Sequence, residues 1–411
     1  MERASACSKT TATGISAEMG DGACRLPAIV ATGASDGAKS GEGKETMMAG
    51  GAACTVTETK LDRDVRAVRL ENRLIAVTVL PDKGADIYQL ISKLHDLDVL
   101  WKSPWGVPRP TGIHTPAADS LTAWMDAYEG GWQEILPSGG GPSHYRGAEL
   151  VFHGEASMSA WDYRIERESG DTAEVTFSLR LRRTPLSIRR VMRIEADSPV
   201  LTLTERITNH GSDPLDLMWG HHPAYGSPFL SGDVRIDTNA RGIRSDDERD
   251  SPLNPFSQGG QTRWPTAERD GVETDLARVP DQSTPRETMA YLHDFSGDRG
   301  WYGLTNTRLG VGVGVVWPTA VFPYAWFWQE FHASAGYPWH REVYVMAIEP
   351  FSSFPGQGLA KVIDKTGNQI VLAPGESRDA ELRAVLFEST AGIRSIEPDG
   401  SVVLREAAAA Q

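Results

Sequence analysis

Apolar and polar residues alternate over much of the chain beyond about residue 54. Residues 175–181 alternate in the period of a strand with one buried face, and residues 201–204 repeat the pattern. Residues 209–214 then supply Asn, Gly, Asp and Pro, which are typical of a turn. The run 343–348 is apolar on both faces, as expected of an inner strand. This pattern predicts a protein built mainly of strands.

Further segments have the composition of strands, and no long stretch has helical periodicity. These segments are residues 72–80, 188–194, 311–317, 370–372 and 382–387. Short strands with closely spaced turns predict an all-β fold, a large antiparallel β-sandwich. The polar stretch from about residue 238 to 288 predicts a long surface excursion that could cover a site.

The chain divides into a low-complexity segment and one domain. Residues 1–53 are rich in Gly, Ala, Ser and Thr and carry little apolar bulk, so we expect a disordered tail. The sequence leaves open whether this segment is a tail, a linker or the product of an early start codon. Residues 54–405 are predicted to form a single domain.

Composition narrows the class of protein. The 411 residues carry a formal net charge of −14, which argues against nucleic acid as a partner. No apolar run approaches the roughly 20 residues of a membrane span, and no apolar stretch typical of a signal peptide follows Arg3 and Lys9. The cysteines are Cys7, Cys24 and Cys54, so the domain does not rely on disulfides. We therefore expect a cytoplasmic monomer or homodimer that acts on a small molecule.

The most informative segment for chemistry contains two adjacent histidines. His221 and His222 precede Pro223, which holds the backbone before it extended, and adjacent strand residues face opposite ways. A histidine has the side-chain pKa best matched to proton transfer near neutral pH. The residues alone are also compatible with two hydrogen-bonded structural histidines.

Two further residues stand where apolar runs end. Glu349 follows an apolar run and precedes Pro350, and a carboxylate there is costly to bury unless it has a partner or a function. It could also simply emerge into solvent. His153 follows residues 150–152 and precedes Gly154, which permits a close approach of ligand or backbone. A histidine in an ordinary turn is the alternative.

Other chemistries have weaker signals. His153, His221, His222 and Glu349 could form a metal site, but no closely spaced ligand motif is present. No G-x-S-x-G elbow is present for a nucleophilic serine. Glycoside hydrolysis by two carboxylates, such as Glu134 with Glu349, is chemically feasible.

Together these segments resemble the galactose-mutarotase-like superfamily, in particular its aldose 1-epimerase-related branch. The resemblance rests on His153-Gly154, on Gly-His-His-Pro-Ala-Tyr at residues 220–225, and on Ile-Glu-Pro at residues 348–350, in that order. It spans residues 72–387. It implies a β supersandwich of large antiparallel sheets with a sugar site on a concave face, and a mutarotase reaction that needs no cofactor or metal.

The resemblance also implies roles for individual residues. It makes His222 the general acid, Glu349 the general base and His153 a substrate-binding residue. We further expect substrate contacts from Trp132, Gln133, His221, Tyr225 and Trp328, since the chain has 12 Trp and aromatic faces stack against sugars. The acid and base are expected on opposite sides of a space the size of a pyranose, with His222 protonated at the start.

The sequence departs from the family pattern beside His153. Glu155 stands near the place where relatives often carry an arginine, and the Asn-Arg motif of true galactose mutarotases is not evident. These departures leave the sugar and its phosphorylation state open. A carbohydrate-binding protein without catalysis, or a hydrolase or lyase on the same scaffold, are the alternative functions.

Overall fold

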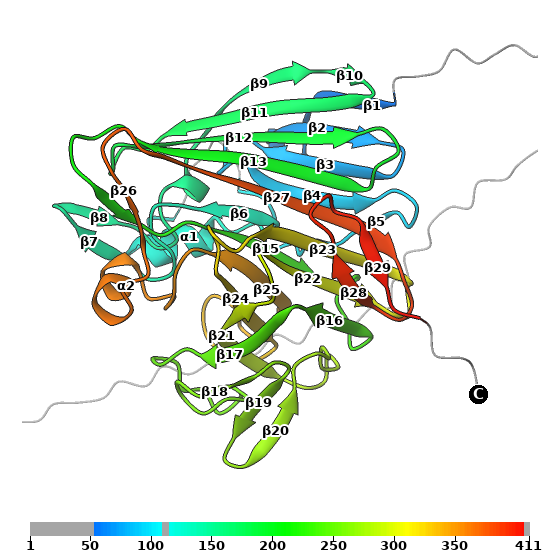
Figure 1. Ribbon diagram of the computed structural model, residues 1–411, viewed down its shortest axis with the longest axis vertical. Helices are drawn as coiled ribbons and strands as arrows, with labels where there is room; N and C mark the ends of the chain where they lie inside the picture. The colour runs from blue at the N-terminus through cyan, green and yellow to red at the C-terminus, as the bar shows by residue number, and fades with distance from the viewer. Residues whose placement is uncertain (1–52, 109–114, 407–411) are drawn as a thin grey trace, which may run out of the picture. The chain divides into compact units, whose positions relative to one another are not determined.

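The computed structural model describes residues 53–108 and 115–406 of the chain (Figure 1). The predicted tail, residues 1–53, lies outside these ranges except for its last residue. The described residues form two large antiparallel sheets, which confirms the predicted all-β class. Within them, no helix combines the length and the apolar character needed to span a membrane.

The larger sheet has 13 strands and contains the segments that carry the candidate chemistry. In spatial order its strands are β10 (Ser169–Gly170), β1 (Cys54–Lys60), β2 (Arg66–Asn72), β3 (Ile75–Leu80), β4 (Asp86–Ser92), β6 (Trp132–Ile135), β15 (Gly220–Gly226), β25 (Tyr344–Phe351), β24 (Tyr324–Phe331), β21 (Arg286–Phe295), β17 (Ala240–Ser245) and β18 (Gln261–Arg263), with β5 (Leu97–Asp98) paired to β4. The sheet thus brings β6, β15 and β25 together from distant parts of the sequence.

The second sheet has eight strands, four of which run side by side across the top of Figure 1. In spatial order they are β16 (Val234–Thr238), β22 (Arg299–Asn306), β23 (Val311–Pro318), β27 (Ser377–Glu388), β13 (Val200–Asn209), β12 (Leu186–Glu195), β11 (Thr172–Arg180) and β9 (Asp162–Arg167). The alternating segments of the sequence lie mainly in β11 and β13 of this sheet, where one face of the strand packs on the core and the other is partly exposed.

Smaller elements border the two sheets. They are the pairs β14 (Leu215–Leu217) with β26 (Ile370–Leu372), β19 (Thr266–Arg269) with β20 (Val272–Asp275), β28 (Ile393–Ile396) with β29 (Val402–Leu404) and β7 (Ser143–Tyr145) with β8 (Ala148–Leu150), the helices α1 (Ser120–Asp126) and α2 (Leu359–Lys365), and the 3-10 turns η1 (Asp62–Asp64) and η2 (Ala156–Met158). The predicted excursion, residues 238–288, is partly regular because it contains β17 to β20.

One predicted strand is placed wrongly. We expected a strand over residues 72–80, but the chain turns at Asn72 and the second strand begins at Ile75. The Asn72 side-chain oxygen accepts hydrogen bonds of 2.8 Å from the backbone N–H groups of Leu74 and Ile75. Asparagine forms such local bonds readily and so ends the strand.

An ion pair interrupts the apolar core between the sheets. Along β12 the inward positions are otherwise apolar, yet Arg190 occupies one of them, and its partner across the ladder on β13 is Glu205. Arg190 Nε donates to Glu205 Oε1 at 2.7 Å, and Arg190 Nη1 donates to the Ala85 carbonyl at 3.0 Å. Burial of such a pair is tolerated only when each group is well satisfied.

The larger sheet supplies the other half of this network. Glu134 on β6 lies directly across from His221 on β15, and Glu134 accepts a hydrogen bond from Arg190. His221 Nε2 lies 3.1 Å from Glu205 Oε2, close enough for an ion pair although the N–H is not aligned as a hydrogen bond. Burial raises the pKa of Glu134 to about 7, whereas the two carboxylates raise the pKa of His221 against its burial. Both shifts favour a bound proton at this pair.

We predict that Arg190→Met destabilises the protein by about 3–5 kcal/mol, because it leaves buried carboxylates without their cation. Urea denaturation measures the free energy of unfolding. The matched control is Arg189→Met, since Arg189 is exposed on the opposite face of β12 and its loss should cost less than about 1 kcal/mol. Equal losses for the two variants would show that the network does not stabilise the core.

Candidate active site

Strand β15 separates the two adjacent histidines onto opposite faces of the larger sheet. Every residue of the strand is buried, so both faces are covered. Tyr225 belongs to the apolar core between the sheets, whereas Ala224 belongs to a second apolar cluster on the outer face. By the alternation of side chains along a strand, His221 shares the face of Tyr225 and His222 that of Ala224.

His222 and Glu349 are direct neighbours on this outer face. The pairing of β15 with β25 matches Gly220 to Phe351 and Ala224 to Ala347, which places His222 across from Glu349. His222 Nε2 lies 3.7 Å from Glu349 Oε1. The two side chains therefore stand side by side in the wall of one cavity. The expectation that a pyranose fits between them is wrong, because cross-strand neighbours are too close.

The cavity around this pair is narrow and largely aromatic. Its volume is about 90 Å³, well below the roughly 300 Å³ at the lower end of small-molecule pockets, so a sugar ring must displace side chains at its mouth. Arg249, whose side chain is half-exposed, stands at the solvent side of this lining. The lining comprises Trp124, Met125, Tyr128, Gly140, Phe152, His153, His222, Arg249, Met289, Trp326, Trp328, Trp339, Glu349 and Gly356.

His153 reaches the cavity from a tight turn. It has a φ of 55°, and Gly154 after it has a φ of 71° and lies so close to β6 that a Cβ would meet the Leu136 carbonyl oxygen at 2.2 Å. The backbone N–H of Gly140 donates to His153 Nδ1 at 3.2 Å, which assigns the ring hydrogen to Nε2. Burial, with the nearby charges of His222 and Arg249, holds the pKa of His153 well below its ordinary value. His153 is thus a neutral hydrogen-bond donor.

Helix α1 carries aromatic side chains into the same cavity. The Asp119 carboxylate caps the helix by accepting from the Thr122 N–H at 2.8 Å. Trp124 packs on the His153 ring with a centroid distance of 4.7 Å. The Tyr128 hydroxyl lies 3.5 Å from His222 Nδ1, where it can donate a weak hydrogen bond. Either atom can be the donor, and with the ring hydrogen on Nδ1 the other ring nitrogen, Nε2 beside Glu349, is free to accept a proton.

Burial sets the protonation state of the pair. It lowers the pKa of His222 to about 4. It raises the pKa of Glu349 well above its ordinary value, against the opposing charge of Arg249. Both shifts favour the state in which the proton of the pair resides on Glu349. Burial thus opposes the protonated His222 expected from the sequence, because desolvation disfavours a charged imidazole.

Four predicted substrate contacts lie outside the cavity. Trp132, His221 and Tyr225 face the core between the sheets, where Trp132 Nε1 donates to His221 Nδ1 at 3.2 Å and the Tyr225 hydroxyl bonds to Tyr302 at 2.7 Å. Gln133 lies across from His222 in the sheet but is fully buried, and its side-chain amide donates to the Gly130 carbonyl at 2.6 Å. Both faces of these strands are buried, so a sequence pattern could not show which face held the site.

Sequence reasoning found some of the lining and missed the rest. It identified His153, His222, Trp328 and Glu349, which the structure brings together. It missed Trp124, Tyr128, Trp326, Trp339 and Arg249. Trp326 and Trp328 are two positions apart in a strand and must share a face, a signal that was available. No such signal marked Trp124 on α1 or Tyr128 just after it, because a seven-residue helix gives little periodicity.

A group of possible metal ligands lies between the sheets rather than in the cavity. One oxygen or nitrogen from each of Glu134, Glu205 and His221 lies within 4.8 Å of the others. Arg190 already contacts both carboxylates and would repel a metal cation. These residues are therefore better described as a buried ion network than as a metal centre.

The fold is that of galactose mutarotase-like proteins. It is similar to a "putative aldose 1-epimerase" from Klebsiella pneumoniae, with 16% identity, a TM-score of 0.63, and coverage of 83% of this chain and 85% of that one. A galactose mutarotase-like protein from Clostridium acetobutylicum has 15% identity and a TM-score of 0.58, covering 81% and 98%. One from Lactobacillus casei has 16% identity and a TM-score of 0.52, covering 78% and 100%.

In sequence, the chain belongs to the family described as Domain of unknown function (DUF4432), which matches residues 62–386. None of the curated proteins matches this chain. The family therefore carries no stated activity, and the fold is shared at identities too low to transfer one.

We predict that His222 makes the protein less stable in mild acid. Its pKa of about 4 lies below the 6.5 of an unfolded histidine, so the unfolded state binds more protons as the pH falls through this range. Relative to His222→Gln, the wild type should lose roughly 3 kcal/mol of unfolding free energy between about pH 7 and pH 4. Urea denaturation across this range measures the difference. A relative gain in acid would instead indicate a protonated His222 paired with ionised Glu349.

Proposed function

We propose that this protein is an aldose 1-epimerase that interconverts the anomers of a sugar. The observation that carries the proposal is the convergence of His222, Glu349 and His153 in one aromatic cavity. Glu349 is only 2% exposed, and its Oε2 has no hydrogen-bond partner among the described residues. A buried carboxyl group left in this state is costly and marks a functional position.

The geometry suits proton transfer at an anomeric centre. The anomeric hydroxyl oxygen and the ring oxygen of an aldose are both bonded to C1 and therefore lie close together. Two neighbouring side chains can each reach one of these oxygens. Neutral His222 takes the proton of the anomeric hydroxyl while protonated Glu349 gives its proton to the ring oxygen. The C1–O5 bond breaks, C1 becomes an aldehyde carbon, and the pair becomes imidazolium and carboxylate.

Ring closure reverses these transfers. After rotation about C1–C2, the carboxylate of Glu349 takes back the hydroxyl proton as O5 attacks the other face of C1. Imidazolium His222 returns its proton to the carbonyl oxygen. The neutral pair is restored, and no proton is exchanged with solvent. The roles are the reverse of those that the family resemblance implies, because burial leaves the proton on Glu349.

The other residues bind the ring. Trp124, Trp328 and Trp339 offer flat apolar surfaces, and such faces stack on the apolar C–H face of a pyranose. His153 presents its Nε2 hydrogen to a sugar hydroxyl. These groups position the anomeric centre beside His222 and Glu349, which is how an enzyme converts binding into rate.

The alternatives are less well supported. Hydrolysis by Glu134 with Glu349 requires two carboxyl groups in one cavity, yet Glu134 lies between the sheets and hydrogen-bonds Arg190. A binding protein without catalysis would keep the aromatic walls. It would not require an acid–base pair at the wall of the cavity.

We predict that Glu349→Gln and His222→Gln each lower the anomer exchange rate by about 10²–10⁴-fold, because each removes one proton-transfer partner. The double variant should lose less than the product of the two losses, since both groups act in one step. Exchange NMR between anomers of a panel of aldoses measures the rate. His293→Gln is the control, because this partly buried histidine on β21 lies outside the cavity. A fully active Glu349→Gln would sink the mechanism.

We also predict that a chelator leaves the exchange rate unchanged. The chemistry proposed is proton transfer among His222, Glu349 and the sugar, with no part for a metal. The measurement compares exchange in buffer and in EDTA. Loss of turnover that a defined divalent ion restores would favour a metal-dependent reaction instead.

A further inference from the structure

Arg249 brings a positive charge to the mouth of the cavity. It lines the same cavity as His222 and Glu349, and its side chain is 52% exposed. Its nearest carboxylate is that of Glu287, with Nη1 3.8 Å from Oε1, too far for a hydrogen bond. Its charge nevertheless opposes the burial effect on Glu349 and adds to that on His153. The guanidinium is thus close to the reacting groups but only loosely paired.

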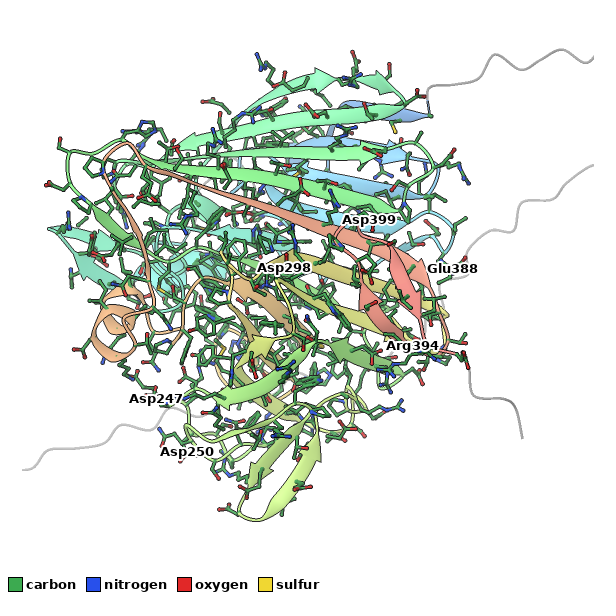
Figure 2. All side chains as sticks on the ribbon, viewed as in Figure 1. Asp247, Asp250, Asp298, Glu388, Arg394 and Asp399 are labelled. Atoms are coloured by element: carbon green, nitrogen blue, oxygen red, sulfur yellow. The ribbon has the colours of Figure 1, made fainter. Side chains whose placement is uncertain are left out.

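The acidic residues beside Arg249 already have other partners. Asp247 and Glu248 both bind the Lys365 ammonium group, at 3.0 Å and 2.9 Å. Asp250 pairs with Arg269 at 3.1 Å. Figure 2 labels Asp247 and Asp250, which flank Arg249 on the segment between β17 and β18. These pairings hold the segment at both sides and leave the Arg249 guanidinium without a strong anionic partner.

The cavity offers no ionised partner for this guanidinium. The remaining lining is aromatic, methionine or glycine, and burial favours the neutral forms of His153, His222 and Glu349. Apart from Arg249, the lining contains neither lysine nor arginine. One guanidinium matches a single carboxylate, which it binds with two parallel hydrogen bonds. A phosphate dianion would leave part of its charge uncompensated here.

We infer that the substrate is an aldose carrying one carboxylate, a uronic acid, whose carboxylate binds Arg249 while its anomeric carbon lies beside His222 and Glu349. This inference rests on the proposed function and names its substrate class. In a pyranuronate the carboxyl carbon is bonded to C5, which shares the ring oxygen with C1, so the carboxylate lies near the reacting centre. This agrees with a guanidinium whose charge acts on Glu349 and His153 in the same cavity.

The test compares Arg249→Gln and Arg249→Lys with wild type on D-glucuronate, D-glucose and D-glucose 6-phosphate. Anomer exchange is measured by NMR, and binding by saturation-transfer NMR titration of each sugar. We expect Arg249→Gln to lower kcat/KM and affinity for glucuronate by roughly 10- to 100-fold, as for loss of a charge-assisted hydrogen bond. The loss should be larger for glucuronate than for glucose, because only glucuronate carries the carboxylate, and Arg249→Lys should retain part of the affinity. Arg263→Gln, an exposed arginine on β18 outside the cavity, is the matched control.

The outcomes separate this inference from the proposed function. Exchange of glucose or glucose 6-phosphate in preference to glucuronate, unaffected by Arg249→Gln, overturns the uronic acid and leaves the epimerase. Glucuronate binding that depends on Arg249 without any anomer exchange overturns the epimerase and supports the anion site. Equal losses in Arg249→Gln and Arg263→Gln show a general charge effect and overturn the inference.

Discussion

The pairing of β15 with β6 and β25 is the constraint on which the site depends. Its register sets His222 beside Glu349 on one face and His221 beside Glu134 on the other. A shift of one residue would exchange the two histidines between the cavity and the core. The same shift would bury members of the ion network against aromatic rings. Residues on both faces of β15 therefore specify the register.

The ion network contributes more to specificity than to net stability. Replacing a buried network by apolar residues is often neutral, whereas removing one member is costly. Here Arg190 and Glu205 come from one sheet, and Glu134 and His221 come from the other. Any pairing that misaligned the sheets would leave at least one buried charge alone. The network thereby disfavours competing registers. Because His221 is a member of the network, the network also fixes the position of His222, the next residue in the strand.

Sequence predicted the fold better than the site. Alternation identified β11, β12 and β13 because each has one polar face, and turn residues marked their ends. The same alternation contained a signal left unused, since Arg190 and Glu205 stand at inward positions between apolar residues. Strands β6 and β15 are buried on both faces, so nothing local distinguished His222 from His221. Protonation could not be predicted either, because it depends on how completely the folded chain excludes water.

The exclusion of water links the chemistry of the pair to the choice of substrate. A neutral pair needs no permanent counter-charge in the cavity. Burial favours the neutral pair over imidazolium and carboxylate, because the charged pair requires the desolvation of two ions. In the proposed reaction the cost appears only when both groups become charged beside the open-chain sugar and attract each other across 3.7 Å. Because the resting cavity is neutral, Arg249 is its dominant fixed charge. Under the proposed function, a single cation at the mouth of a neutral aromatic cavity distinguishes sugars by charge before any hydroxyl is recognised.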